Sequence, residues 1–333
     1  MLRAGVFALV SGVAVAVVEA AVPVDALAFS PNGKILALNR HRLLQFHDVE
    51  SADNVFHELD LPRITSVRFS PDGKWLGVTG GLPGSRGGLR LFAWRKGKSF
   101  AKRDSFSDTA NALAFHPQGR SLAVGASDRN VLIYAMKDGR LEAEPTHTLT
   151  DHSRPVLSLE YSPDGKILVT ASADRSLKVW NAETGELIRS LGNHTEIVHA
   201  IAMRPPVTFA GRLLPTYCAS GSDDHTVRVW QPGIGRMVRI VRYHEAPVFA
   251  LGWHPKGDRI YSAGKDGVIR VIDGDSDEIL SKWKAHDDWI YSLAVSPDGK
   301  HVATGDWAGR VKIWESKNEA VSLARELPQG PGN

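Results

Sequence analysis

The residues of this 333-residue chain that could do chemistry are histidines, hydroxyl residues and aspartates that recur together. A histidine placed between a hydroxyl group and a carboxylate can activate a nucleophile, as it does in many hydrolases. Two complete sets, each ending in a tryptophan, occupy the middle of the chain: His152, Thr170, Asp174 and Trp180; His194, Ser220, Asp224 and Trp230. Hydrolysis is therefore the first hypothesis to weigh.

The repetition of these sets argues against catalysis. A catalytic triad is needed once and must meet an oxyanion-stabilising site, whereas a stabilising device can recur throughout a fold. Two less complete sets follow in the same order: His244, Ser262 and Asp266; His286, Thr304 and Trp314. The first of these ends in Ile272, and the second has Ala308 at the position expected for aspartate. We therefore expect a non-enzymatic protein with no catalytic residues.

Composition offers no other chemistry. The 40 basic side chains nearly balance the 37 acidic ones, so charge does not point to a polyanionic partner. Cys218 is the single cysteine, which excludes an intrachain disulfide and a site with paired thiolates. The sequence also has no HExxH motif and no glycine-rich phosphate loop between a strand and a helix. We expect no metal and no cofactor.

An internal repeat positions the recurring sets. A Ser/His-Pro-x-Gly turn recurs at intervals of 40 to 46 residues when its one gap of 92 is counted as two repeats, and residues 203–206 fill that gap in degenerate form. These turns start at Ser30, Ser70, His116, Ser162, His254 and Ser296. A short strand ending in a large apolar residue also occurs seven times, at 43–46, 89–92, 131–134, 177–180, 227–230, 268–272 and 311–314. The two markers agree in number and phase, which predicts seven units.

Each unit reads as four short strands separated by turn residues. The fourth unit shows them best, at 156–161, 167–171, 177–180 and 187–191. The first strand of each unit is mostly apolar, so we expect it to line a crowded axis and to offer no polar site in a central channel. The sequence therefore predicts an all-β fold, a single seven-bladed β-propeller of four-stranded antiparallel blades over residues 22–326, followed by a flexible tail at 327–333.

The same residues resemble those of the WD-repeat (WD40) family. The resemblance rests on the closing Trp180 and Trp230, the aspartate six residues before each, and the histidine that precedes each first strand. It implies that the recurring sets are structural tetrads, in which carboxylate, imidazole, hydroxyl and indole groups bond in sequence and leave few buried donors unpaired. The resemblance is specific for fold and says little about function.

Not every unit keeps its tetrad. The third unit retains only Asp128, with Val124 and Tyr134 at the hydroxyl and indole positions. The first and second units have Arg40 and Arg86 where the aspartate would stand. We therefore expect stability to be uneven around the ring.

The amino terminus resembles a secretory signal peptide. Arg3 precedes an uncharged, mostly apolar run at 4–18, and small residues follow at plausible cleavage positions. The run is about 15 residues, short of the roughly 20 that a membrane-spanning helix needs. The alternative is that residues 1–20 form a strand, but the last unit supplies its own fourth strand at 320–325. A cleaved segment implies a secreted or periplasmic protein; otherwise we expect a cytoplasmic one, with membrane contact only through an uncleaved amino terminus.

One face of such a propeller is the expected binding surface. It carries the connections from each fourth strand to the next first strand, the turns between second and third strands, and the glycine-rich segment 80–88, which we interpret as a long flexible turn. Exposed tryptophans are common interface anchors, although these two could instead pack on each other. The candidate residues on this face are Arg154, Arg175, Glu196, His225, Lys265, Trp289 and Trp307.

The opposite face offers a weaker candidate for nucleic-acid binding. An insertion at 205–215 lies there, together with a basic loop between third and fourth strands of the second unit that carries Arg95, Lys96, Lys98, Lys102 and Arg103 around Phe100. Solvated loop charge is the favoured interpretation, because no repeated aromatic platform accompanies these residues. The leading prediction is a scaffold for a protein or peptide partner. The alternatives are an accessory subunit of a secreted or periplasmic enzyme or electron-transfer assembly, and a propeller enzyme with a channel site.

Overall fold

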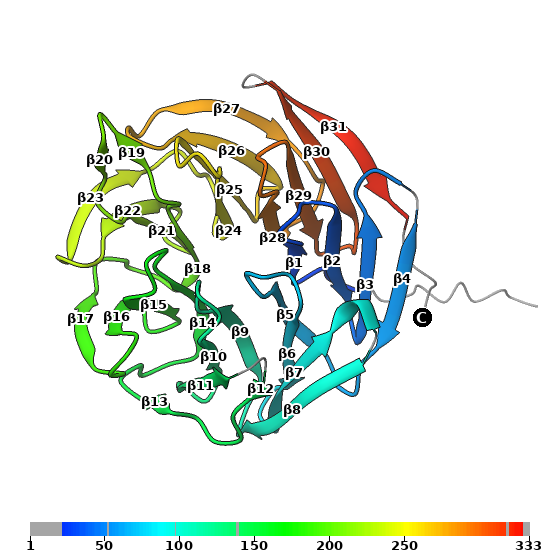
Figure 1. The fold of residues 1–333 in the computed structure, drawn as a ribbon. Coiled ribbons are helices and arrows are strands. Elements are labelled where there is room, and N and C mark those ends of the chain that lie inside the picture. The colour runs from blue at the N-terminus through cyan, green and yellow to red at the C-terminus, as the bar shows by residue number, and fades with distance from the viewer. Residues whose placement is uncertain (1–21, 52, 97, 138–139, 318–319, 329–333) are drawn as a thin grey trace, which may run out of the picture.

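Seven antiparallel sheets surround a central axis in the computed structural model, which describes residues 22–51, 53–96, 98–137, 140–317 and 320–328 (Figure 1). The only helical element in these ranges is the 3-10 turn η1 (Trp94–Lys96). The structure confirms the all-β, seven-bladed propeller. Residues 1–20, for which the sequence predicts a signal peptide or a surplus segment, lie outside the described residues.

Each blade uses its strands in chain order, with the first strand at the axis and the last at the rim (Figure 1). Blades one to three consist of β1 (Leu27–Phe29), β2 (Ile35–Arg40), β3 (Leu43–Asp48) and β4 (Asn54–Glu58); β5 (Ile64–Phe69), β6 (Leu76–Leu82), β7 (Arg86–Ala93) and β8 (Lys98–Phe106); and β9 (Ala110–Phe115), β10 (Ser121–Ala126), β11 (Val131–Lys137) and a divided outer strand, β12 (Arg140–Leu141) and β13 (His147–Leu149).

Blades four to seven follow the same plan. They consist of β14 (Val156–Tyr161), β15 (Ile167–Ser172), β16 (Leu177–Asn181) and β17 (Leu187–Leu191); β18 (Val198–Met203), β21 (Cys218–Ser222), β22 (Val227–Gln231) and β23 (Arg236–Val241); β24 (Val248–Trp253), β25 (Arg259–Gly264), β26 (Val268–Asp273) and β27 (Ile279–Lys284); and β28 (Ile290–Val295), β29 (His301–Asp306), β30 (Val311–Lys317) and β31 (Ala320–Leu327). The insertion of blade five is the hairpin β19 (Thr208–Phe209) and β20 (Arg212–Leu213).

The recurring Ser-Pro-x-Gly turn joins first and second strands for a local reason. In blade four, Ser162 Oγ donates to Asp164 Oδ1 at 2.6 Å and accepts the Ile167 N–H at 3.1 Å. Gly165 has a φ of 75°, in the left-handed region that glycine adopts without strain. The turn therefore satisfies its own polar groups, which explains why one short motif marks the phase of the repeat.

Apolar packing between neighbouring blades forms the core and closes the ring. A cluster that joins blades seven and one includes Leu27, Leu38, Ile313 and Leu327, all buried. The backbone also bonds across this junction, where the Val24 N–H donates to the Asp306 carbonyl at 3.2 Å. Because β31 pairs with β30 in its own blade, closure needs no shared strand. Leu327 ends β31, so the expected boundary of a tail at 327 is wrong by one residue.

Strand register corrects two further expectations. In blade four Trp180 pairs with Leu168, and the counterpart of this pair in blade one is His47 with Leu36, so His47 rather than Phe46 stands at the tryptophan position. The segment 80–88 is not a long flexible turn, because β6 and β7 extend through most of it and leave only 83–85 between them. A Cβ on Gly80 would lie 1.9 Å from the Arg63 carbonyl oxygen, so this close approach requires glycine.

The basic segment of blade two is also a strand rather than a loop. Residues 98–106 form β8, which pairs with β7 along most of its length. Lys102 forms ion pairs with Asp60 and Asp104, and Arg103 donates to the Leu141 and Glu142 carbonyl oxygens. Arg95 lies in η1, and its guanidinium is 5.1 Å from the centroid of the Trp94 ring. Arg95, Lys102 and Arg103 therefore all contact other groups of the protein. No helix among the described residues combines the length and the apolar character that crossing a membrane demands.

Candidate binding surface

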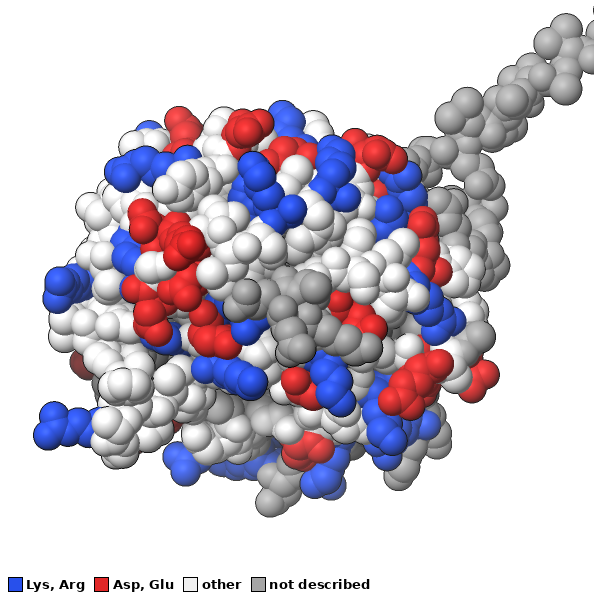
Figure 2. Space-filling view, turned by 90° about the horizontal axis from the view of Figure 1, so that it is seen from above, with Lys and Arg blue, Asp and Glu red and all other residues white. Residues whose placement is uncertain are grey.

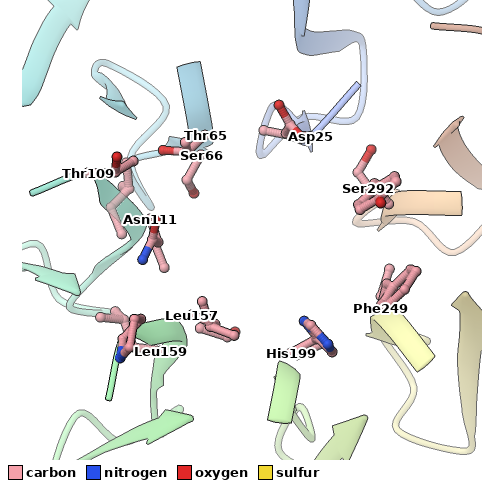
Figure 3. A pocket seen from close by; sticks show the side chains of 18 of the residues that line it. Asp25, Thr65, Ser66, Thr109, Asn111, Leu157, Leu159, His199, Phe249 and Ser292 are labelled. Carbon is pink, nitrogen blue, oxygen red and sulfur yellow. The ribbon is translucent and has the colours of Figure 1, made fainter. Parts of the chain in front are cut away.

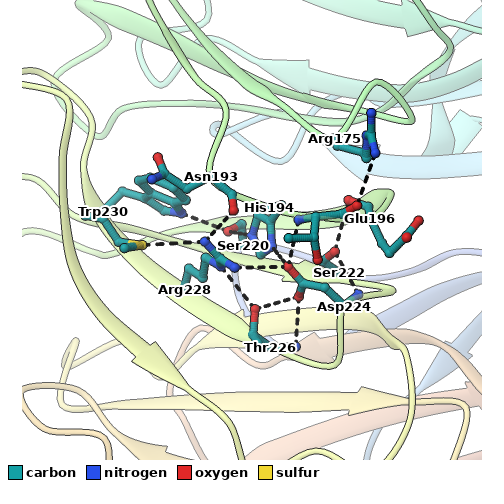
Figure 4. Close-up of polar contacts among 12 residues, drawn as sticks. Arg175, Asn193, His194, Glu196, Ser220, Ser222, Asp224, Thr226, Arg228 and Trp230 are labelled. Carbon is teal, nitrogen blue, oxygen red and sulfur yellow. Dashed lines mark hydrogen bonds and ion pairs between the residues drawn. The ribbon is translucent and has the colours of Figure 1, made fainter.

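The complete sets of blades four and five form continuous hydrogen-bonded chains. In blade five, Trp230 Nε1 donates to Ser220 Oγ at 2.8 Å, Ser220 Oγ lies 2.7 Å from His194 Nε2, and His194 Nδ1 lies 2.7 Å from Asp224 Oδ2 (Figure 4). Blade four repeats these contacts within 0.1 Å, at 2.9, 2.7 and 2.7 Å, through Trp180, Thr170, His152 and Asp174. Each chain ties the loop before a first strand to the turn after a second strand.

Burial and hydrogen bonding set the charge states of the residues in these chains. Burial raises the pKa of the Asp224 carboxyl, but hydrogen bonds from His194 and Thr226 outweigh it and hold that pKa well below its ordinary range. Burial also lowers the pKa of His194. A neutral imidazole that donates from Nδ1 to the carboxylate and accepts the Ser220 hydroxyl satisfies every member. Ser220 is fully buried, so its oxygen is unavailable to a substrate.

Blade seven completes its chain with an aspartate that the sequence reasoning missed. His286 Nδ1 lies 2.8 Å from Asp306 Oδ2, and His286 Nε2 lies 2.8 Å from Thr304 Oγ1, which accepts the Trp314 indole N–H at 2.9 Å. The prediction that Ala308 leaves this set without a carboxylate is therefore wrong. Asp306 stands two residues after Thr304, where a fixed six-residue spacing from tryptophan does not look for it.

Blade six keeps the residue types but loses one link. His244 Nε2 lies 2.8 Å from Ser262 Oγ, while the buried His244 Nδ1 has no hydrogen-bond partner. Asp266 Oδ2 lies 2.7 Å from the Nη1 of Arg270 instead. Burial accordingly lowers the pKa of His244 to about 3.

The first three blades use other contacts. Arg90 in blade two is buried and forms ion pairs with Asp60 and Asp104 at 2.6 and 2.7 Å. In blade three, the Ser107 hydroxyl donates to Asp128 at 3.0 Å. Arg40, at the end of β2, bonds to the Gly309 and Pro328 carbonyl oxygens and so ties blade one to blade seven. Arginine thus links neighbouring segments in blades that have no tetrad.

The structure brings three of the seven predicted face residues together. Trp289 and Trp307 have ring centroids 6.1 Å apart and remain 37% and 44% exposed. The Lys265 ammonium lies 4.5 Å from the centroid of Trp289, a cation–π contact. The other four candidates are exposed at loops and turns of blades four and five, away from the tryptophan pair: Arg154, Arg175, Glu196 and His225.

The tryptophan pair continues into a wall of rings that sequence reasoning missed. The Tyr291 ring lies 5.6 Å from Trp307 and 6.2 Å from Trp289, and it stacks on Phe249 at 5.2 Å with an interplanar angle of 10°. His199 meets Phe249 edge to face at 5.0 Å. We call these five residues the aromatic surface. A signal was present, because His199, Phe249 and Tyr291 are each the second residue of their strands.

The aromatic surface forms one side of the channel mouth. The same strand position in the first three blades carries polar residues, and Figure 3 shows Asp25, Thr65 and Asn111 across the opening from His199 and Phe249. A cavity of about 510 Å³ opens here and continues along the axis. The mouth therefore has an aromatic half and a polar half.

The channel interior corrects the expectation of apolar first strands. Arg68 on β5 and Glu160 on β14 both line the axis, where we expected no charged residue. Within the described ranges, no group of three or more His, Cys, Asp or Glu side chains is placed to hold a metal ion. On the edge of the ring presented in Figure 2, basic and acidic side chains are interspersed.

Comparison with known proteins identifies related sequences over most of the chain. Periodic tryptophan protein 2 of Arabidopsis thaliana is 24% identical over 298 residues, which is 86% of this chain and 32% of that protein. The COMPASS component SWD3 of Saccharomyces cerevisiae is 26% identical over 262 residues, or 76% of this chain and 64% of that protein. Nuclear distribution protein PAC1 of Arthroderma otae is 27% identical over 216 residues, or 64% and 37%. The chain thus spans less than two thirds of each of these three relatives.

None of these three names supports the secreted or periplasmic location. The family profile described as WD40, WD domain, G-beta repeat matches six segments, residues 56–88, 102–134, 143–181, 185–231, 235–273 and 277–315. Each match begins at or close to the outer strand of one blade and ends at the third strand of the next, so the first three strands of blade one lie outside the matches. These six matches cover more than half of the chain, and the structure has seven blades, so the chain belongs to the WD40 repeat family.

Proposed function

We propose that this chain is a non-enzymatic scaffold that binds a protein or peptide at the channel mouth, through the aromatic surface. The observation that carries the proposal is the exposure of Trp289 and Trp307 beside buried, tetrad-anchored turns. Tryptophan is among the residues that most often dominate the energy of protein interfaces. A rigid platform also lowers the entropy cost of binding, because its side chains are already ordered before the partner arrives.

The geometry of the surface favours an extended partner segment. The two indoles offer a flat apolar area beside the channel mouth, and the Phe249 and Tyr291 rings extend this area towards the channel. Polar residues on the far side of the mouth could bond to the segment's backbone. The printed name of one relative, COMPASS component, describes a member of a complex, which agrees with a scaffold.

We also propose that the protein is not an enzyme and that it works inside the cell. The hydroxyl groups of Thr170 and Ser220, the nucleophiles that a hydrolase reading would need, are buried within their tetrads. The name nuclear distribution protein, printed for another relative, supports an intracellular location over the secreted or periplasmic alternative. Nucleic-acid binding is a weaker candidate, because Lys102 and Arg103 already bond within the protein.

Affinity capture with matched variants tests the proposal. Tagged wild-type protein and a W289A/W307A double variant are exposed to the same lysate, and the captured proteins are compared by mass spectrometry. Each indole anchor is worth about 2 kcal/mol, so we expect the double variant to lose at least about a hundredfold in affinity for a specific partner. Partners captured equally by wild type and double variant would contradict the proposal.

A second double variant controls for the loss of exposed apolar area. Phe209 and Leu213 are 73% and 70% exposed on the β19–β20 hairpin, on the opposite face. We expect F209A/L213A to capture the same partners as wild type. Thermal unfolding verifies that both variants are folded. We expect a small loss for W289A/W307A, because the two indoles pack on each other and on Tyr291.

A further inference from the structure

The central channel breaks its sevenfold repetition at one level. Pairing of first with second strands aligns Arg68 with one residue of every other first strand. Five of these residues are small: Ala28, Ala114, Ala202, Gly252 and Ala294. The remaining one is Glu160. Packing against the next first strand accounts for the small residues, since a Cβ on Gly252 would lie 2.9 Å from the Val295 side chain. It gives no reason for a long arginine among them.

Arg68 lies at the inner end of the cavity that opens at the channel mouth. This cavity is lined by mouth residues such as Asp25 and by Arg68. Arg68 also lines the cavity that enters from the opposite face. The Arg68 side chain therefore stands where the two openings meet and can be approached from the aromatic surface.

The Arg68 guanidinium has donors to spare. Its Nη1 donates to the Val67 carbonyl oxygen at 3.0 Å, and no carboxylate in the described part of the chain forms an ion pair with it. Asp25 is already bound by Arg63, with Arg63 Nη2 at 2.7 Å from its Oδ1. The other charges at the mouth are therefore paired or, as with Asp108, accept backbone N–H groups.

Two serines one level nearer the mouth add further donors. Ser158 Oγ accepts the Ile201 N–H at 3.1 Å, which leaves its own hydrogen free to donate into the cavity. Ser66 precedes Arg68 by two residues and therefore faces the same side of β5. Arg68, Ser66 and Ser158 all line this cavity, and arginine and hydroxyl donors suit a ligand that only accepts hydrogen bonds.

Glu160, the other charged residue at this level, forms no ion pair with Arg68. Its Oε2 accepts the Met203 N–H at 2.6 Å rather than pairing with Arg68. Burial raises the pKa of the Glu160 carboxyl in spite of the nearby guanidinium. The Arg68 guanidinium therefore keeps donors for a ligand, and Glu160 acts on it through its charge and not through a hydrogen bond.

We propose that the mouth cavity is a carboxylate-binding site, in which the Arg68 guanidinium holds both oxygens and the hydroxyls of Ser66 and Ser158 donate further bonds. The inference rests on the proposed function for the source of that group, which is an acidic side chain or chain end of the peptide held at the aromatic surface. The partner would thus place apolar side chains on the indoles and an acidic group in the channel.

Calorimetric titration with succinate tests the chemistry of the cavity without the partner. We expect wild type to bind succinate with a dissociation constant on the order of 1 mM, as befits a small ligand with few contacts. Arg68→Gln should weaken binding at least about tenfold, since it removes a charge-assisted bidentate contact. Arg68→Lys should recover part of the affinity, and the thermal midpoint of each variant shows that it is folded.

Comparison ligands and a comparison variant keep this test separate from the proposed function. Succinamide and putrescine, which are neutral and cationic, should not bind; binding of putrescine in place of succinate would overturn the proposal. So would the absence of succinate binding to wild type, or equal binding to the Arg68→Gln variant. The W289A/W307A variant should bind succinate as wild type does, even though we expect it to lose its protein partner.

Discussion

Blades five and six have histidine, serine and aspartate at the same tetrad positions, but the hydrogen bonds among these residues differ. In blade five His194 bonds to both Ser220 and Asp224. In blade six His244 bonds only to Ser262, and its second ring nitrogen is buried without a partner. Residue types at the usual spacing therefore do not by themselves complete a tetrad.

The residue two positions after the aspartate accounts for the difference. Thr226 donates its hydroxyl to Asp224 Oδ1 at 2.6 Å and accepts from Arg228 Nε at 3.2 Å, so it holds both charged groups in place (Figure 4). Val268 occupies this position in blade six and offers no hydroxyl. Arg270 Nε has no hydrogen-bond partner there. The Asp266 carboxylate of blade six therefore pairs with Arg270 and makes no hydrogen bond to the His244 imidazole.

The largest expected effect comes from removing the carboxylate of a complete tetrad. Asp174→Ala and Asp224→Ala should each lower the free energy of unfolding by about 3 kcal/mol, because each strands a buried imidazole N–H and a hydroxyl. Urea unfolding measures the loss. Asp151→Ala, an exposed carboxylate one residue before His152, should change stability by less than about 0.5 kcal/mol. An unchanged thermal midpoint in the tetrad variants would refute the structural role.

An intermediate effect is expected from pH. The pKa of His244 is about 3 in the folded protein, below the ordinary value of 6.5, because burial disfavours its charged form. The unfolded chain therefore binds more protons between these values. This contribution to stability is complete above about pH 6.5 and is lost as pH falls, at about 1.4 kcal/mol per pH unit.

His244→Leu isolates that contribution. The variant should show a shallower fall in unfolding free energy between about pH 6 and pH 4 than wild type, measured by urea titration at each pH. If the two slopes are the same, His244 is not held neutral by burial in the folded protein.

The smallest expected effect comes from giving blade six the hydroxyl of blade five. It tests directly whether this hydroxyl explains the difference between the two blades. Val268→Thr supplies the hydroxyl that blade five has, and the two side chains have nearly the same shape. We expect it to stabilise the protein by about 1 kcal/mol, through hydrogen bonds to Asp266 and Arg270. The reverse change in blade five, Thr226→Val, should cost about the same amount. Destabilisation by Val268→Thr would show that the hydroxyl is not what blade six lacks.

The sequence predicts the fold well because the turn that starts at Ser162 is local and self-satisfied. The same is true of the tetrads of blades four and five, whose spacing follows strand length. Asp306 escapes the pattern because its carboxylate reaches His286 from the end of the strand instead of the turn. The aromatic surface could not be predicted, because its residues are far apart in the sequence. Phe249 and Tyr291 are neighbours only because successive blades stand side by side.

The charged channel was also beyond sequence reasoning. Arg68 and Glu160 have one blade between them, and each looks like a single exception within an apolar strand. Only the register of all seven first strands reveals that both interrupt one ring of small residues. A repeat marks which positions are equivalent, and the residue that we propose to bind a carboxylate is an exception at such a position.

The most direct test of the binding surface is hydrogen–deuterium exchange of the protein alone and with a captured partner. We expect binding to slow exchange in the segments that surround the tryptophan pair, residues 265–268, 286–291 and 305–309. Exchange in the β19–β20 hairpin should not change. Protection confined to that hairpin or to the turns between first and second strands would contradict it, because those segments lie on the opposite face.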